Sequence, residues 1–250
     1  MSKQDRFDRL NLLVGEAGLT RLKQSSVAVF GLGGVGSYAV EALVRGGIGR
    51  LTLIDFDLVD ITNCNRQIHA HDGTIGLPKA MVMAERCRAI NPDVQAEPLQ
   101  TFYSHENSEE LLLRGYDYVL DCIDHITAKL HLIEACITKK LPIISSMGAA
   151  NKLDPTRILV ADLADTSNCR LARILRRELR RRGIHNGVKT VYSTEEFRPL
   201  SDGRREAPSQ EAGQYQAQRA PLGSSSVIPP LFGLTMAGEV IRELLMEKAS

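Results

Sequence analysis

A glycine-rich hexapeptide near the start of the chain has the residue types and spacing that bind phosphate groups. Gly31-Leu32-Gly33-Gly34-Val35-Gly36 fits G-x-G-x-x-G, in which glycines form a tight turn and let backbone N–H groups approach a phosphate. Asp55 lies 19 residues after Gly36, where a carboxylate can accept hydrogen bonds from ribose hydroxyls. We therefore expect a nucleotide at this turn. The expected contacts come from Gly31, Gly33, Gly34, Gly36 and Asp55.

Two cations and a second acid further along the chain favour transfer of a phosphate-containing group over hydride transfer. Arg66 and Lys79, 13 residues apart, would stabilise the negative charge that builds on phosphate oxygens as a bond to phosphorus breaks. Lys79 follows Pro78 and should lie near a helix N-terminus, which also attracts anions. Asp124 follows an apolar run, where it would ligate a metal ion that bridges nucleotide phosphates, cap the next helix, or do both.

Alternating apolar runs and helical patterns predict a doubly wound, mainly parallel, Rossmann-like α/β sheet. Ligands in such sheets bind beyond the carboxyl ends of the strands, so the glycine turn and the charged residues should meet there. The expected strands of the first part cover 27–30, 51–54, 94–98, 116–121 and 141–146. The expected helices between them include 79–89, 104–114 with Ser104 as N-cap, and 126–138.

The last hundred residues differ in character and predict a smaller C-terminal α+β extension. The expected elements are strands over 157–163 and 188–193, helices over 169–182 and 229–248, and a long loop over 197–224. We expect a nucleotide-binding core over 1–150, with an N-terminal arm over 1–24. The substrate-binding extension should cover 151–250 and belong to the same globular unit.

The helix expected over 169–182 is rich in arginine. Leu171, Leu175 and Leu179 recur at a helical spacing and would face the core. The other face is either a solvated helix surface or a positively charged surface that contacts RNA phosphates. Its arginines are Arg170, Arg173, Arg176, Arg177, Arg180, Arg181 and Arg182. Cys169, beside Arg170 at the helix start, is either a buried packing residue or a reactive thiol.

The composition is that of a globular protein from a reducing compartment. The chain has 250 residues, 43% of them hydrophobic, which is enough to bury a substantial core. Five cysteines without a CxxC pair argue against disulfides and against a structural zinc site. The N-terminus lacks the apolar segment of a signal peptide, and the apolar stretch 227–241 contains Pro229, Pro230 and Glu239. We therefore expect a cytoplasmic protein that does not span a membrane.

Five short motifs follow one another along the first half of the chain. They are GLGGVGS from Gly31, LIDFDLVD from Leu53, NCNRQ from Asn63, GLPKA from Gly76 and LDCID from Leu120. Together they resemble the ThiF/MoeB/HesA family of ATP-dependent adenylating enzymes, which are relatives of ubiquitin activators. The resemblance implies that the nucleotide is ATP with Mg²⁺, and it adds Asp57 and Asn63 to the expected contacts. Within the family, the chain is most similar to the branch that dehydrates threonylcarbamoyladenosine in tRNA.

The resemblance also gives a role to an arginine pair at the N-terminus. Arg6 and Arg9 precede a helical segment expected to end near Gly18, and on their own they indicate a solvated helix face. Family members carry an R-[FY]-x-R element whose arginine reaches the ATP site of the neighbouring subunit. One of the pair is therefore expected to act in trans within a homodimer. Where relatives usually have DNxxT, this chain has His125 after Asp124, so a contact made by that asparagine stays open.

Three functions are compatible with these residues. The favoured one is ATP-dependent adenylation of the carboxylate of threonylcarbamoyladenosine beside a tRNA anticodon. The catalytic residues would be Arg66, Lys79, Asp124 and either Arg6 or Arg9. A second function is adenylation of a ubiquitin-like sulfur-carrier protein, which would require Cys169 and involve sulfur-relay partners. A third is that of an NAD-binding oxidoreductase, which has little use for Arg66 and Lys79.

Overall fold

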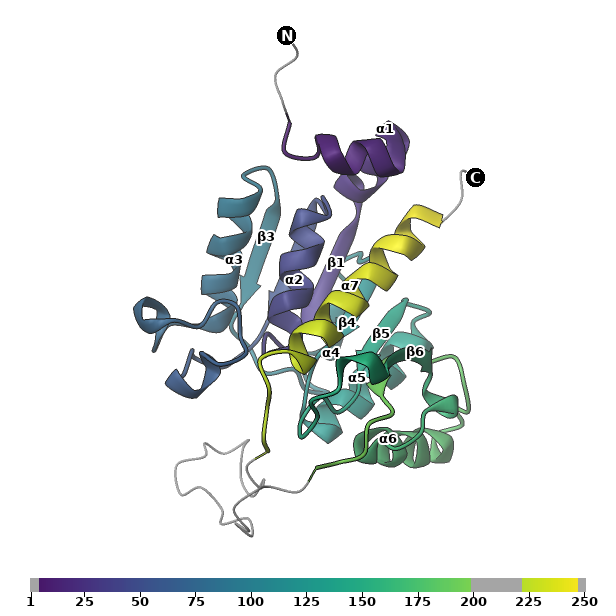
Figure 1. The fold of residues 1–250 in the computed structure, drawn as a ribbon. Helices are drawn as coiled ribbons and strands as arrows, with labels where there is room; N and C mark the ends of the chain where they lie inside the picture. The colour runs from purple at the N-terminus through teal and green to yellow at the C-terminus, as the bar shows by residue number, and fades with distance from the viewer. Residues whose placement is uncertain (1–4, 199–221, 247–250) are drawn as a thin grey trace.

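The computed structural model of the protein describes residues 5–198 and 222–246, which form one seven-stranded sheet with helices on both faces (Figure 1). The strand order is β3-β2-β1-β4-β5-β7-β6. Neighbours from β3 to β7 run parallel, and β6 is antiparallel to β7 at the edge. The strands are β1 Ser26–Phe30, β2 Arg50–Ile54, β3 Gln95–Leu99, β4 Tyr118–Asp121, β5 Ile143–Ser146, β6 Ile158–Asp162 and β7 Lys189–Ser193.

Two groups of helices bury the two faces of the sheet. α2, α3 and α7 contribute to the apolar cluster on one face, and α4, α5 and α6 contribute to the cluster on the other. α1 lies at the amino ends of β1 and β2, where the Gly49 N–H donates to the Leu22 carbonyl. The helices are α1 Asp8–Gln24, α2 Gly36–Arg45, α3 Lys79–Ile90, α4 Ser108–Leu112, α5 Ile126–Thr138, α6 Arg170–Arg181 and α7 Ile228–Met246.

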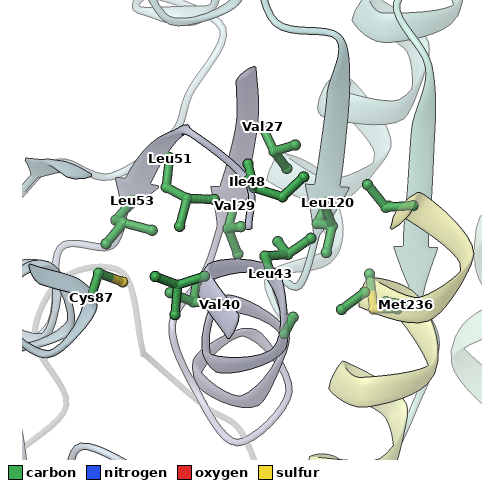
Figure 2. Packing of buried hydrophobic residues seen from close by; sticks show 14 of the residues in the cluster. Val27, Val29, Val40, Leu43, Ile48, Leu51, Leu53, Cys87, Leu120 and Met236 are labelled. Carbon is green, nitrogen blue, oxygen red and sulfur yellow. The ribbon is translucent and has the colours of Figure 1, made fainter. Parts of the chain in front are cut away.

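The central strands are apolar on both sides because helices cover both faces. Every residue of β1 is buried, as expected for a strand of a doubly covered parallel sheet. Figure 2 shows the α2 face, where Val29 of β1 and Leu53 of β2 lie over Val40 and Leu43 of α2. Met236 of α7 extends the same cluster. The packing of α2 against β1 and β2 therefore fixes where the turn between β1 and α2 stands.

The C-terminal helix α7 packs directly against α2 and against the glycine turn before it. A Cβ atom on Gly233 would overlap the carbonyl oxygen of Val35, so only glycine allows the two helices to approach this closely. A Cβ atom on Gly34 would lie 2.9 Å from the Cβ of Pro229. The last helix of the described chain thus supports one of its first turns.

The structure corrects two predicted helix boundaries. α1 is kinked at Gly15, whose φ is +71°, and its second part continues past Gly18 to Gln24, because Leu19 and Leu22 are buried and Gly18 permits close packing on Leu245. α4 is shorter than the predicted 104–114, and Ser104 is not its N-cap. The Asn107 side chain occupies the turn, because its Oδ1 accepts from the Ser104 N–H at 2.9 Å.

The predicted C-terminal strands join the main sheet. β7 pairs with β5 in parallel, and β6 completes the edge. The division at residue 150 stays a prediction. Most of the loop expected over 197–224, and the end of the helix expected to reach residue 248, lie outside the described residues. Among residues 5–198 and 222–246, no helix is both long and apolar enough to cross a membrane.

Candidate active site

A cleft of about 720 Å³ opens beyond the carboxyl ends of β1, β2, β4 and β5. Segments far apart in the sequence meet there because parallel strands present their carboxyl ends at one edge. The cleft brings together nine predicted residues, namely Gly31, Gly33, Gly34, Asp55, Asp57, Asn63, Arg66, Lys79 and Asp124. Gly36, which was also predicted to contact the nucleotide, is not among its lining residues.

The glycine turn needs its glycines for two different reasons. Gly31 has a φ of +89°, which disfavours other residues, and a Cβ there would lie 2.8 Å from the Cys122 carbonyl oxygen. A Cβ on Gly36 would overlap the Gly31 carbonyl oxygen, so Gly36 closes the turn without facing the cleft. α2 begins at Gly36, so the positive end of the helix dipole favours an anion here.

Asp55 is buried at the base of the cleft, where backbone N–H groups hold its carboxylate. Its Oδ2 accepts from the Leu32 N–H at 2.6 Å, and its Oδ1 accepts from the Asp57 N–H at 2.8 Å. Burial raises the pKa of Asp55, while Lys79 and the two N–H groups favour the charged form. Each carboxylate oxygen can accept a further bond, so the group retains capacity for ribose hydroxyls.

Lys79 enters the cleft from the first residue of α3, as its position after Pro78 predicted. Its Nζ lies 2.8 Å from Oδ2 of Asp57, and 7% of its side chain is exposed. The ion pair fixes the ammonium group on the side of the cleft that also holds Asp55. Because a charge held in place needs little reorganisation as a reaction proceeds, Lys79 is suited to stabilise developing negative charge.

Arg66 occupies the segment between β2 and α3, and neighbouring residues orient its guanidinium. Nη1 donates to the Thr62 carbonyl at 2.7 Å and to Oδ1 of Asn65 at 2.8 Å. Burial lowers the pKa of Arg66, while Asp124 and Asp60 act in the opposite direction. An arginine stays charged under such conditions, so the Arg66 guanidinium remains a cation in the cleft.

Asp124 lies just beyond β4 with an exposed side chain on the wall of the cleft. The helix-capping role proposed for it belongs to His125, whose Nδ1 accepts from the Ala128 N–H at 3.3 Å. Within residues 5–198 and 222–246, no three or more His, Cys, Asp or Glu side chains form a group that could hold a metal ion. A carboxylate beside a phosphate site fits Mg²⁺, which usually combines one or two protein carboxylates with substrate phosphates.

Several cleft residues were not predicted from the sequence. Gln67 is buried, and its Oε1 finds no partner among the described residues. It belongs to the NCNRQ motif, which was the one available signal for it. Phe102 lies edge-on to Phe56 at 5.1 Å and to His125 at 5.6 Å. Leu171 enters from α6, and nothing in its apolar spacing distinguishes it from a core leucine.

A sequence model of the ThiF family matches residues 7–250. The chain belongs to the ThiF family. A tRNA threonylcarbamoyladenosine dehydratase of Bacillus subtilis (strain 168) is 42% identical over 241 residues, which cover 96% of this chain and 95% of that protein. The crystal structure of the E. coli tRNA N6-threonylcarbamoyladenosine dehydratase in complex with ATP has a TM-score of 0.85 and 36% identity, covering 96% of this chain and 93% of that one.

A more distant ThiF-family relative is similar over a shorter stretch. The molybdopterin-synthase adenylyltransferase of Salmonella typhimurium (strain LT2) is 36% identical over 151 residues, which cover 60% of this chain and 59% of that protein. The similarity to the dehydratases therefore includes the C-terminal strands and α6, whereas the similarity to this adenylyltransferase leaves two fifths of the chain unmatched.

The N-terminal arginine pair of this ThiF-family chain lies far from its own cleft. Arg6 donates from Nη1 to the Ile90 carbonyl at 2.5 Å, at the end of α3 that precedes β3. Arg9 lies in the first turn of α1 at the same amino edge of the sheet. Neither residue lines the cleft, so any contact with ATP has to reach the site of another copy.

α6 of this ThiF-family chain buries Leu175 and Leu179 as predicted and exposes most of its arginines. Several of these arginines already have partners. Arg177 and Arg181 pair with Glu178, Arg182 with Glu134, and Arg170 stacks on Phe197, while Arg176 donates to Thr166. The side chains of Arg173 and Arg180 make no ion pair or hydrogen bond in the part of the chain that the structure describes. Both residues remain candidates for phosphate contact.

Cys169 is the N-cap of α6 and is buried. Its Sγ accepts from the Ala172 N–H at 3.5 Å. A Cβ on Gly148, a residue of the cleft wall, would lie 3.7 Å from this sulfur. The thiol thus lies behind the wall of the cleft and packs there, which suits a structural residue better than an exposed nucleophile.

Proposed function

We propose that this ThiF-family protein is an ATP-dependent tRNA threonylcarbamoyladenosine dehydratase that works in the cytoplasm. The observation that carries the proposal is the similarity to such dehydratases over nearly the whole length of both chains. The similarity of the residues beyond 150 supports this function most strongly, because these residues contribute α6 and place Leu171 in the wall of the cleft. A substrate bound beside the ATP would therefore be next to the arginine-rich helix.

The first step of the proposed reaction is adenylation. ATP lies with its phosphates over the glycine turn and its ribose at Asp55. The carboxylate of threonylcarbamoyladenosine attacks the α-phosphorus, and an O–P bond forms as the bond to pyrophosphate breaks. Arg66 and Lys79 stabilise the charge on the phosphate oxygens, each with a contribution on the order of a hundredfold in rate. Arg6 or Arg9 of a partner subunit adds a third cation within a homodimer.

The second step closes a ring. A nucleophilic group within the modified base attacks the acyl carbon, and AMP leaves with one of the former carboxylate oxygens. The net change in the tRNA is loss of one water. The enzyme supplies no covalent nucleophile in this scheme, which agrees with the buried position of Cys169.

Asp124 is the residue that would hold Mg²⁺ at the cleft, with Asp57 close to the same phosphates. When bound, Mg²⁺ neutralises charge on the phosphates and orients them. The exposed arginines of α6, Arg173 and Arg180 in particular, would contact the tRNA backbone and add affinity without sequence specificity.

The test is ATP–pyrophosphate exchange with labelled pyrophosphate. We expect exchange that depends on tRNA containing threonylcarbamoyladenosine and does not occur with unmodified tRNA. Lys79→Ala should lose about a hundredfold in rate. Lys139→Ala, which removes an ion pair with exposed Glu109 far from the cleft, should match the wild type. Exchange that requires a sulfur-carrier protein and ignores tRNA would replace the proposal by the carrier-adenylating function and its sulfur-relay partners.

A further inference from the structure

A completely buried ion pair lies directly behind the cleft. Nζ of Lys129, on α5, is 2.9 Å from Oδ2 of Asp121, at the end of β4, and both side chains have 0% exposure. Ser145 on β5 donates its hydroxyl to the same carboxylate oxygen at 2.6 Å. Removing two charges from water costs several kcal/mol per ion, and apolar residues of similar size often stabilise a fold better. The pair therefore needs an explanation other than stability.

The remaining hydrogen bonds of the pair all go to the loop that carries Asp124. Nζ of Lys129 also donates to the carbonyl of Ile123 at 2.9 Å and to that of Asp121 at 3.4 Å. Oδ1 of Asp121 accepts from the Ile123 N–H at 3.2 Å. Two side chains thus hold the backbone of residues 121–123, where the strand pairing of β4 ends.

This loop touches both halves of the phosphate site. On one side, Gly31 packs so closely on the Cys122 carbonyl that a Cβ would lie 2.8 Å from it, and the Cys122 N–H donates to the Phe30 carbonyl at 2.8 Å. On the other side, the next residue along the chain is Asp124. A shift of residues 121–123 would therefore change the distance between the glycine turn and the carboxylate.

We propose that Lys129, through its ion pair with Asp121, is a positioning residue that holds residues 121–124 so that the glycine turn and Asp124 contact the same ATP. The inference rests on the proposed function for the identity of the ligand. The placement of the loop rests on the contacts alone. Lys129 itself has no exposed surface and does not line the cleft, so it acts through the loop carbonyls.

The test removes the pair without leaving a buried charge. Lys129→Met alone would strand the Asp121 carboxylate, so the informative protein is Lys129→Met with Asp121→Asn. The amide oxygen of the introduced asparagine can accept from the Ile123 N–H, and its NH2 group can donate to the Ser145 hydroxyl oxygen. A matched control is Glu41→Gln with Arg86→Met, which removes a partly buried pair between α2 and α3 whose members do not line the cleft.

We expect the double variant to fold with cooperative unfolding, while the amides of residues 122–124 exchange hydrogen about tenfold faster than in the wild type. Turnover in ATP–pyrophosphate exchange should fall by at least tenfold, because small misplacements of reacting groups cost rates of this order. In a protein that already carries Asp124→Asn, the same two substitutions should cause little further loss of turnover. The control variant should change neither amide exchange at 122–124 nor turnover.

Two results would overturn the inference. One is unchanged amide protection at residues 122–124, whatever the activity. The other is a loss of turnover that adds in full to that of Asp124→Asn. Amide hydrogen exchange requires no substrate. A wild type without any ATP–pyrophosphate exchange would therefore refute the proposed function, while the amide hydrogen exchange of residues 122–124 would still decide the positioning inference.

Discussion

Lowering the pH from 7 to 5 should destabilise this protein through one buried histidine. His69 lies between the segment that carries Arg66 and Gln67 and the start of α3, and 2% of it is exposed. Neither ring nitrogen has a hydrogen-bond partner among the described residues. Burial, with further contributions from Lys79 and Arg86, lowers the pKa of His69 to about 4.

The size of the effect follows from proton linkage. The folded pKa of about 4 lies below the unfolded value of 6.5, so between these values the unfolded chain binds a proton that the folded chain does not. Stability due to this group is complete above pH 6.5 and falls as the pH falls. The loss reaches about 2 kcal/mol at pH 5 and approaches about 3 kcal/mol near pH 4, since one pKa unit corresponds to about 1.4 kcal/mol.

The measurement is urea unfolding of the wild type and of His69→Leu at pH 7 and pH 5, followed by circular dichroism. Leucine cannot titrate, while the carboxylates that also lose stability in acid are the same in both proteins. The wild type should therefore lose about 2 kcal/mol more than the variant between the two pH values. An equal loss in both proteins would refute the reasoning.

Three further predictions concern the helix contacts, the RNA surface and the metal. Gly233→Ala should lower the free energy of unfolding by about 1–3 kcal/mol, because the added Cβ overlaps the Val35 carbonyl. Gly238→Ala on the same helix meets open space and should be neutral or stabilising by up to about 1 kcal/mol, so similar losses would contradict the packing argument. Replacing Arg173 and Arg180 with Gln should reduce the slope of log affinity for tRNA against log salt by about two, and an unchanged slope would exclude α6 from the interface. Adding EDTA should abolish pyrophosphate exchange and leave the unfolding midpoint unchanged, and exchange that persists would argue against a metal at Asp124.

The parallel sheet and the phosphate turn were predictable because local signals determine them. β1 is a short apolar run that ends at the glycine motif, and β2 is a second short apolar run after the helix that follows, an order typical of a parallel βαβ unit with the glycines at its first turn. Lys79 and Asp124 could be placed at the cleft because one begins a helix and the other follows a strand, whereas Arg66 was identified by its charge and by the NCNRQ motif. The edge of a parallel sheet brings such positions together without any knowledge of side-chain contacts.

What could not be predicted depends on partners distant in sequence. A lysine on a helix is normally solvated. The burial of Lys129 becomes evident only once Asp121 and Ser145 are in place. Asp124 and His125 are neighbouring residues that can both cap α5, and the choice depends on backbone angles that the sequence does not give. The contact of α7 with α2 also depends on a partner distant in sequence. The apolar residues of a helix indicate that it is buried, but they do not indicate which element it packs against.

That contact has a consequence for biosynthesis. A chain emerging from the ribosome presents the glycine turn early, but Pro229 and Gly233, which pack against it, follow only when nearly all the residues have been added. Domains generally fold as units during translation, so a nascent chain of this protein should remain unable to retain nucleotide until residue 246 is released. Truncated products that end before α7 would then be unable to bind ATP.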